Sequence, residues 1–293
     1  MALRGKPPET ITKRLKLLLY GPAGVGKTMA AIQFPKPYLI DTERGAENPA
    51  YVAKLKAAGG AYWFTVDADE MIEEIRSLLS TKHPYRTLVI DPLTVLYNDL
   101  LDKSSAALAT KDDPTGTAFG RHKGPADKKI KHLLALLLRL DMNVVITSHA
   151  KTKWEKAGKE IVDAGQTFDC YGKLDYLFDL ALEVQRRGKD RVGIVRKTRL
   201  DAFPEADIFP FSYDEIADRY GRDVLERDAK PEALASAEQI VEIKALLEAR
   251  KDGDDLAEKW LTKAGAETFE EMSSDAIGKC INFLRSGAAG KAA

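Results

Sequence analysis

The chain has 293 residues, enough for one large domain or for a large domain with a small appendage. No stretch reaches the roughly 18 consecutive apolar residues of a membrane-spanning helix, and the N-terminal residues lack the apolar core of a signal peptide, so we expect a cytoplasmic protein without a membrane partner. The formal net charge is zero, but Lys and Arg predominate up to residue 200, and Asp and Glu predominate from 201 to 275. Proteins that handle nucleic acids show such a division, and so do proteins with unequally solvated faces.

Short apolar runs alternate with helical patterns through the first half of the chain. We expect strands at residues 15–20, 37–41, 62–66, 87–91 and 143–149. Helical patterns begin near residues 27, 49, 69, 94 and 125. This alternation predicts an α/β fold, with a central, mostly parallel twisted sheet flanked by helices on both faces.

The pattern changes after residue 149. Apolar runs at residues 176–185 and 191–197 flank the short connection RRGKD, which predicts an antiparallel extension of the sheet, and a third run covers residues 207–211. Polar segments at residues 103–124 and 151–166 are longer than most loops of compact domains. We interpret both segments as functional loops.

The C-terminal sequence predicts a small helical module behind a linker. Residues 227–235 have the composition of a linker, and Ser236 with Gln239 forms a capping-box pattern that begins a helix ended by Gly253. Two more short helices are expected at residues 256–265 and 275–286. We therefore divide the chain into a core at residues 1–228 and a C-terminal module at residues 236–286.

The segment GPAGVGKT matches the phosphate-binding pattern G-x-x-x-x-G-K-[ST] at every required position. It follows an apolar strand and precedes a helical stretch, and this context separates the motif from a chance glycine-rich turn. Lys27 is expected to contact the β and γ phosphates of ATP, and Thr28 to bind Mg²⁺. The expected nucleotide-binding residues are Gly21, Pro22, Ala23, Gly24, Val25, Gly26, Lys27, Thr28 and Met29.

Asp91 is the second expected Mg²⁺ residue. It ends the apolar strand TLVI, and carboxylates at strand ends face the crevice in which ligands of parallel sheets bind. The alternative is an N-cap aspartate that begins a helix before Pro92.

Four further segments resemble the core of RecA-like P-loop ATPases, over roughly residues 15–211: YLIDTERGAENPAYVAKL, TLVIDPLTVL, VVITSH and RVGIVRKTRLDAFPEADIFPF. The compact core with TSHAK and a small helical tail is most similar to phage-encoded RecA-like ATPases of single-strand annealing recombination. The resemblance implies ATP and Mg²⁺ as cofactors and, for a phage-encoded protein, the host cytoplasm as its location.

The resemblance implies two catalytic residues that act within one chain. Asp41-Thr42-Glu43 matches the D-x-E that ends the second strand, so Glu43 is the candidate general base; the alternative is an exposed loop glutamate beside Arg44. His149 stands where this family carries a polar sensor of the γ-phosphate, usually glutamine. Histidine keeps the hydrogen-bonding ability and adds a titratable charge. Alternatively, His149 is a strand-end histidine satisfied by its neighbours.

The resemblance also implies two catalytic residues that act on the neighbouring subunit. Lys197 and Arg199 in VRKTRL look like the K-x-R pair that reaches the ATP of an adjacent subunit in recombinases and hexameric helicases. Residues two apart on a strand share a face, so both could approach one γ-phosphate. The alternative is an exposed basic strand edge that discourages aggregation.

In RecA-like proteins the segments after the second nucleotide motif and after the sensor strand bind DNA, and these segments correspond to the two polar segments described above. The first leads into Arg121 and Lys123, and the second holds Trp154 among lysines. Basic groups with an interleaved aromatic ring fit sequence-independent binding of single-stranded DNA. The alternative is a solvated lysine-rich loop with Trp154 packed on the core. The candidates of the second segment are Lys151, Lys153, Trp154, Lys156 and Lys159.

These observations favour a DNA-dependent ATPase whose homo-oligomer holds ATP at the subunit interface and supports recombination or strand annealing on single-stranded DNA. One alternative is a nucleotide-switched adaptor whose C-terminal module docks a single-strand-binding or replication protein. Another alternative is a helicase-type motor, although the sequence contains no accessory helicase domain.

Overall fold

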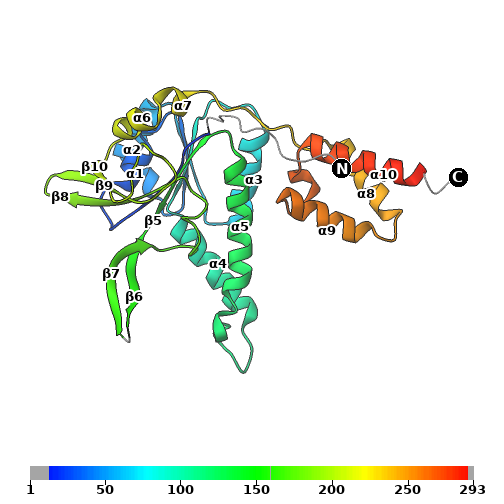
Figure 1. The fold of residues 1–293 in the computed structure, drawn as a ribbon, viewed down its shortest axis with the longest axis horizontal. Coiled ribbons are helices and arrows are strands. Elements are labelled where there is room, and N and C mark those ends of the chain that lie inside the picture. Colours follow the sequence, from blue (N-terminus) through cyan, green and yellow to red (C-terminus); the bar gives the residue numbers. More distant parts are fainter. Residues whose placement is uncertain (1–12, 159, 290–293) are drawn as a thin grey trace.

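The computed structural model describes residues 13–158 and 160–289, so Lys159 lies outside the described residues. Ten strands and ten α-helices make up this part of the chain (Figure 1). The strands are β1 (Lys16–Tyr20), β2 (Pro37–Asp41), β3 (Ala61–Phe64), β4 (Thr87–Asp91), β5 (Asn143–Ser148), β6 (Ala150–Ala157), β7 (Glu160–Phe168), β8 (Leu180–Arg187), β9 (Asp190–Thr198) and β10 (Ile208–Pro210).

Five of the described helices connect successive strands, and the last five follow the final strand of the sheet. They are α1 (Lys27–Ala31), α2 (Pro49–Ala57), α3 (Ala68–Ser80), α4 (Leu93–Leu108), α5 (Lys123–Arg139), α6 (Tyr213–Tyr220), α7 (Arg222–Glu226), α8 (Ala237–Glu248), α9 (Gly253–Ala264) and α10 (Ser274–Ala289). Helices α6 and α7 have no counterpart in the sequence prediction.

A single eight-stranded sheet has the order β10-β9-β8-β1-β5-β4-β2-β3. The strands from β8 to β3 in this order pair in parallel, and β9 pairs antiparallel with both β8 and β10. All five residues of β1 and all six of β5 are buried, as expected for strands covered on both faces. The predicted α/β class with an antiparallel extension is thus confirmed. One strand, β5, separates the strand before the phosphate-binding segment from the strand that ends in Asp91.

Helices cover both faces of the sheet. Successive strand residues point to opposite sides, and apolar residues on both sides need to be buried. Apolar residues of α3, α4 and α5 pack on one face with Leu18, Ile90 and Ile146. Residues of α1, α2, α6 and α7 pack on the other with Leu17 and Leu19. The carboxyl ends of the parallel strands therefore lie between two packed layers, where a site can be held rigidly.

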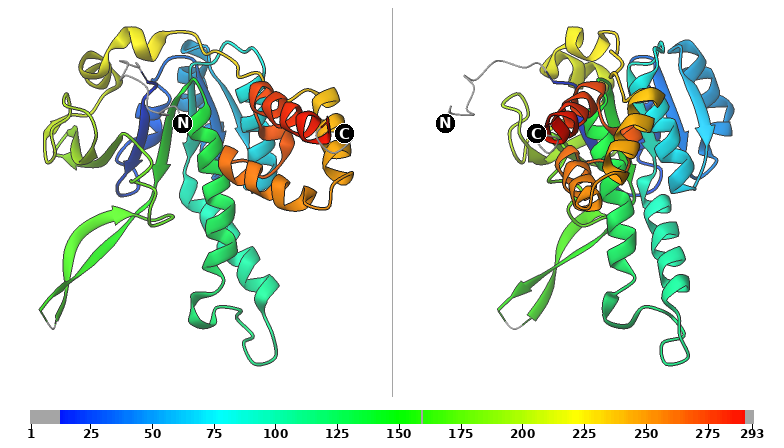
Figure 2. Two further views of the ribbon diagram at one scale, coloured as in Figure 1. Left: turned by 45° about the vertical axis from the view of Figure 1, so that its right-hand side comes forward. Right: turned by 90° about the vertical axis from the view of Figure 1, so that its right-hand side faces the viewer.

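Two arms project from one end of the body, formed by α4 with α5 and by β6 with β7 (Figures 1 and 2). The two expected functional loops are thus more ordered than predicted. Helix α4 continues to Leu108 and α5 begins at Lys123, and residues 150–157 pair antiparallel with residues 160–168. Almost every residue of this hairpin is exposed, so neither of its faces carries the apolar alternation by which strands are recognised in a sequence.

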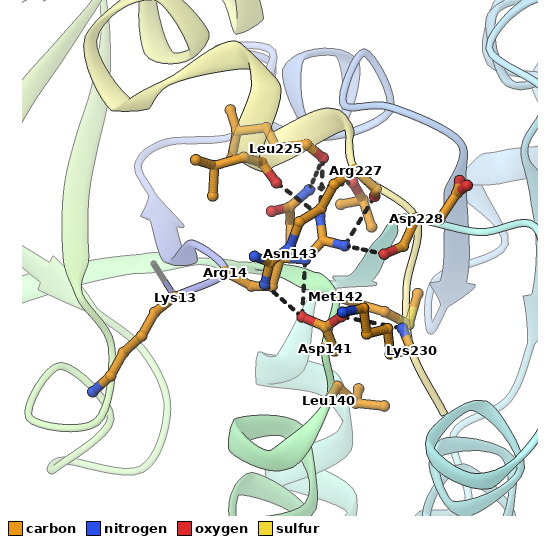
Figure 3. A network of polar contacts seen from close by, with 12 residues as sticks. Lys13, Arg14, Leu140, Asp141, Met142, Asn143, Leu225, Arg227, Asp228 and Lys230 are labelled. Atoms are coloured by element: carbon orange, nitrogen blue, oxygen red, sulfur yellow. Dashed lines mark hydrogen bonds and ion pairs between the residues drawn. The ribbon is translucent and has the colours of Figure 1, made fainter. Parts of the chain in front are cut away.

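Arg14 holds the chain that leaves the sheet (Figure 3). Its buried guanidinium donates to the carbonyl oxygens of Val224 at 2.8 Å, Arg227 at 2.9 Å and Asp228 at 2.8 Å, and to Asp141 Oδ1 at 3.2 Å. The predicted linker therefore begins as a segment fixed by hydrogen bonds, because a buried guanidinium needs acceptors for its five N–H groups.

Helices α8, α9 and α10 form their own apolar cluster, separate from the two clusters of the sheet. The predicted capping box is present, since Ser236 and Gln239 exchange hydrogen bonds at the start of α8. The prediction that Gly253 ends this helix is wrong: α8 ends at Glu248, and Gly253 is the first residue of α9. The division of the chain into two domains stays a prediction.

A buried contact joins the C-terminal helices to the body. The ring of His132 on α5 lies with Nε2 2.8 Å from Glu271 Oε1, and the exposed fractions of the two residues are 8% and 1%. Arg76 on α3 lies 3.9 Å from the same carboxylate, and Arg139 pairs with Glu232 at 3.0 Å.

Within the described residues, no helix is long and apolar enough to cross a lipid bilayer.

Candidate nucleotide-binding site

The phosphate-binding segment connects β1 to α1 and is shaped by glycines. Gly21 has φ 154°, and a Cβ atom there would lie 2.3 Å from the carbonyl oxygen of Val184 on β8. Gly26 has φ 94°, a left-handed conformation that side chains disfavour. The turn and its close approach to β8 therefore require glycine, and the resulting open loop leaves backbone N–H groups free to face an anion.

Lys27 lies beneath this loop and is 9% exposed. Its Nζ atom donates to the carbonyl oxygens of Gly21 at 2.8 Å and Pro22 at 2.9 Å. Burial lowers the pKa of Lys27, while the nearby carboxylates of Asp91 and Glu43 act in the opposite direction. The ammonium group is thus held at the loop by acceptors that phosphate oxygens can replace.

The two expected Mg²⁺ residues lie together. The Asp91 carboxylate accepts a hydrogen bond from Thr147 on β5, and the Thr28 side chain also lies within hydrogen-bonding range of it. Burial raises the pKa of Asp91, and these hydrogen bonds partly offset that effect. The N-cap position of α4 falls on Pro92 and no side chain caps this helix, so the structure does not support the N-cap alternative for Asp91.

A Mg²⁺ ion would fit this pair, because Mg²⁺ bound with nucleotides takes one or two protein oxygen ligands and completes its shell with phosphates and water. Among the described residues, no group of three or more His, Cys, Asp or Glu side chains could form an all-protein metal cage. The donors present therefore suit an ion that arrives with a nucleotide.

Glu43 and His149 are brought into contact. Glu43 Oε1 lies 3.0 Å from His149 Nε2, and each side chain is 46% exposed. Asp41 fixes the turn that carries Glu43, because its carboxylate accepts from the backbone N–H groups of Glu43 at 2.9 Å and Ala46 at 2.8 Å. Glu43 thus lies exposed in the connection after β2, and its backbone is held by Asp41. Its role as general base stays a prediction.

Hydrogen bonds fix the backbone of His149 at the root of the β6–β7 hairpin. Its N–H donates to Thr94 Oγ1 on α4 at 3.0 Å, and its carbonyl oxygen accepts from the N–H of Asp169 at 2.8 Å. Thr94 Oγ1 also lies 3.0 Å from Ser148 Oγ. Sequence reasoning missed Asp41 and Thr94; the strand-end carboxylate of D-x-E was the signal for the first, and nothing in the pattern marked the second.

A family model described as AAA domain matches residues 13–203, about two thirds of the chain. The chain belongs to the AAA domain family. Membership indicates a P-loop ATPase, in agreement with the glycine loop, Lys27 and the pair of Thr28 and Asp91. No curated protein matches the chain.

Lys197 and Arg199 of this AAA domain lie away from its own phosphate-binding loop. Thr198 pairs with Leu180, which pairs with Leu17 near the start of β1, whereas the loop follows the end of that strand. Lys197 Nζ donates to the carbonyl oxygen of Phe178, and Arg199 donates to that of Tyr176. Within one chain the two side chains bind backbone carbonyls of the same segment, and their placement on one face stays a prediction.

The expected DNA-binding residues of the first arm differ in their contacts. Arg121 donates to the carbonyl oxygen of Leu108 at 2.7 Å and to Asp113 at 2.9 Å, so it closes the tip of the α4–α5 arm. Lys123 is exposed and lines a cavity of about 470 Å³ at the root of the two arms. Lys151 from β6 lines the same cavity and pairs with Asp169 at 3.0 Å.

The β6–β7 hairpin presents its aromatic residue to solvent. Trp154 is 64% exposed, so the alternative in which it packs on the core is wrong. Lys153 pairs with Glu155 at 2.5 Å, and Lys156 is exposed in the same strand. Trp154 can therefore meet a ligand without unfolding the hairpin.

Proposed function

We propose that this AAA domain protein is a Mg²⁺-dependent ATPase that binds single-stranded DNA with its two arms. The contact between Glu43 and His149 carries the proposal, because it connects the candidate base to the residue immediately before β6. A change at the γ-phosphate that moves His149 would act at the root of the β6–β7 hairpin. Hydrolysis and the state of the hairpin would thus be coupled through one side-chain pair.

Each residue has a distinct task in the proposed reaction. Lys27 exchanges its loop carbonyls for oxygens of the β and γ phosphates, while Thr28 and Asp91 would hold Mg²⁺, which supplies charge neutralisation at those phosphates. Glu43 orients the attacking water and accepts its proton. His149 holds the Glu43 carboxylate and acts as the sensor of the γ-phosphate.

Two features support single-stranded DNA as the ligand of the arms. Lys123 and Lys151 come from different arms and line one cavity, where with Lys173 they outnumber Asp127 and Asp169. An excess of basic groups suits a backbone that carries a phosphate at every nucleotide. Trp154 offers an exposed ring, and base stacking on such a ring contributes about 1–3 kcal/mol per base without sequence preference. We further propose that the biological process is phage-type recombination or strand annealing.

The proposal includes assembly of several copies. Lys197 and Arg199 cannot serve the nucleotide of their own chain from their place near the start of β1. They would act on a neighbour whose phosphate-binding loop faces them. ATP would then lie at an interface between subunits, where hydrolysis can alter assembly.

Measurement of ATP hydrolysis with and without single-stranded DNA tests the proposal. We expect DNA to change the rate in the wild type, and Trp154→Ala to weaken DNA binding by about tenfold at low ionic strength. Tyr62→Ala is the matched control, because Tyr62 is a 45% exposed aromatic residue on β3 at the far edge of the sheet. A rate that ignores DNA, together with no salt-sensitive binding, would contradict the DNA part and leave the ATPase part standing.

A further inference from the structure

The β8–β9 hairpin lies against the phosphate-binding loop. Glu183 of β8 pairs with Tyr20, the last residue of β1, so the rest of β8 runs beside the loop that follows. A Cβ atom on Gly26 would lie 2.7 Å from Nε and 2.8 Å from Cζ of Arg191 on β9. The guanidinium of Arg191 therefore packs directly on the last glycine of the loop.

A second arginine shares this face of the hairpin. Arg186 pairs directly with Arg191 across the two strands, so both side chains leave the hairpin on the same side. Like charges in such a pair destabilise a hairpin. On the opposite side the next pair, Arg187 with Asp190, combines opposite charges.

In the part of the chain that the structure describes, no carboxylate pairs with either arginine. Within residues 13–158 and 160–289, neither Arg186 nor Arg191 takes part in a side-chain hydrogen bond or an ion pair with an acidic residue, and both are exposed. Two unneutralised guanidinium groups beside a loop built for phosphate form a site for an anion. Guanidinium groups suit phosphate because their planar N–H groups can bind two oxygens at once.

We propose that Arg191, with Arg186 beside it, binds the phosphates of the nucleotide held by the loop of the same chain. This inference rests on the proposed nucleotide binding and adds a contact that neither the glycine motif nor the K-x-R pair predicts. The site would thus have two sources of positive charge in one chain, Lys27 below the loop and Arg191 beside it. Binding of nucleotide would also relieve the repulsion across the hairpin.

Calorimetric titration of Mg-ADP and of inorganic tripolyphosphate into the Arg191→Ala protein tests the inference. We expect both ligands to bind about tenfold more weakly than to the wild type, because a hydrogen bond to a charged group is lost. Arg191→Lys should recover part of the affinity through its charge. Arg187→Ala is the matched control on the opposite side of the same hairpin and should bind both ligands like the wild type.

The outcomes separate this inference from the proposed function. A wild type that binds neither ligand contradicts nucleotide binding itself, and the inference with it. A wild type that binds both, with Arg191→Ala binding them equally well, overturns the inference alone. If Arg191→Ala weakens the binding of Mg-ADP and leaves the binding of tripolyphosphate unchanged, Arg191 contacts the nucleoside and the assignment to the phosphates is wrong.

Discussion

Glycine in the phosphate-binding loop can be required for two reasons, a backbone conformation with positive φ and a lack of space for a Cβ atom. Gly21 and Gly24 differ in the second. Both have positive φ, 154° and 73°, but a Cβ atom on Gly24 would meet open space, whereas one on Gly21 would meet the backbone of Val184 at 2.3 Å. The motif G-x-x-x-x-G-K-[ST] requires glycine at position 21 and leaves position 24 open. Only the fold shows that β8 is the obstacle at one of them.

We predict that Gly21→Ala destabilises the protein more than Gly24→Ala. The second change costs about 1–2 kcal/mol for the left-handed backbone, and the first adds about 1–3 kcal/mol because backbone atoms must move. Thermal unfolding of the two variants measures the difference. Equal melting temperatures would show that β8 gives way to the added methyl group.

The contact between Glu43 and His149 leads to a kinetic prediction. His149→Ala frees the Glu43 carboxylate, so we expect kcat for ATP hydrolysis to fall by about ten- to a hundredfold while nucleotide affinity stays close to the wild type. His149→Gln keeps a hydrogen-bond donor and should retain more activity. Steady-state kinetics beside equilibrium binding checks this, and an unchanged kcat in both variants would remove His149 from the mechanism.

Residue by residue, the sequence predicts the parts of the site that are continuous in the chain. The glycine loop, Lys27 and Thr28 stand in one motif, and Asp91 ends a recognisable strand. Thr94, Thr147 and Arg191 come from other elements. Only the packing of the sheet reveals that they adjoin His149, Asp91 and the loop, respectively. No local pattern marks such residues.

Among the elements, the sequence predicts the buried strands of the sheet, whereas it misses the short helices α6 and α7 although both have a buried side. The strands expected at residues 37–41 and 87–91 coincide with β2 and β4, because each is an apolar run bounded by polar residues. The β6–β7 hairpin has no buried face and was predicted as a loop. An element without a core-facing side leaves no periodic signal, although its two strands pair along most of their length.

Arg121 lies at the tip of the α4–α5 arm, where its contacts predict that it stabilises the connection between the two helices. Asp113 accepts from Arg121 and from the N–H of Ala118, so these groups order the connection between the helices. We predict that Arg121→Ala accelerates amide hydrogen exchange across residues 109–122. Lys123→Ala should leave exchange unchanged and weaken single-stranded DNA binding, and the reverse pattern would exchange the roles of the two residues.

In the whole molecule, the buried carboxylate of Glu271 lies in the contact between the C-terminal helices and the body. Burial acts to raise its pKa, but hydrogen bonds from His132 and the N–H of Glu267, with the charge of Arg76, hold the pKa below its ordinary value of 4.5. A carboxyl group with a lower pKa in the folded state stabilises that state above its unfolded pKa. This contribution is lost as the pH falls through the folded pKa.

We therefore predict that Glu271→Gln lowers the free energy of unfolding by about 1–3 kcal/mol at pH 7 and that its deficit shrinks below pH about 4. Amide exchange in α8 to α10 at both pH values measures it. Glu248→Gln changes an exposed glutamate of α8 and serves as the control. If the deficit in the free energy of unfolding does not depend on pH, the shape of the Glu271 side chain and not its charge maintains the contact with His132.

The proposed assembly predicts that two inactive variants can complement each other. Lys197→Ala subunits and Glu43→Gln subunits should each hydrolyse ATP poorly, and a mixture should recover part of the activity if Lys197 serves a neighbour. Mixing wild-type subunits with the double variant supplies the control for simple dilution. No recovery at any ratio would refute action between subunits.

Arg14 gives the molecule a mechanical property. Its guanidinium grips the carbonyl oxygens of residues 224–228, and it lies two residues before β1, the strand that ends at the phosphate-binding loop. A pull transmitted along residues 224–228 would therefore load the start of β1 directly. From there, force would have a short path along one buried strand to the nucleotide.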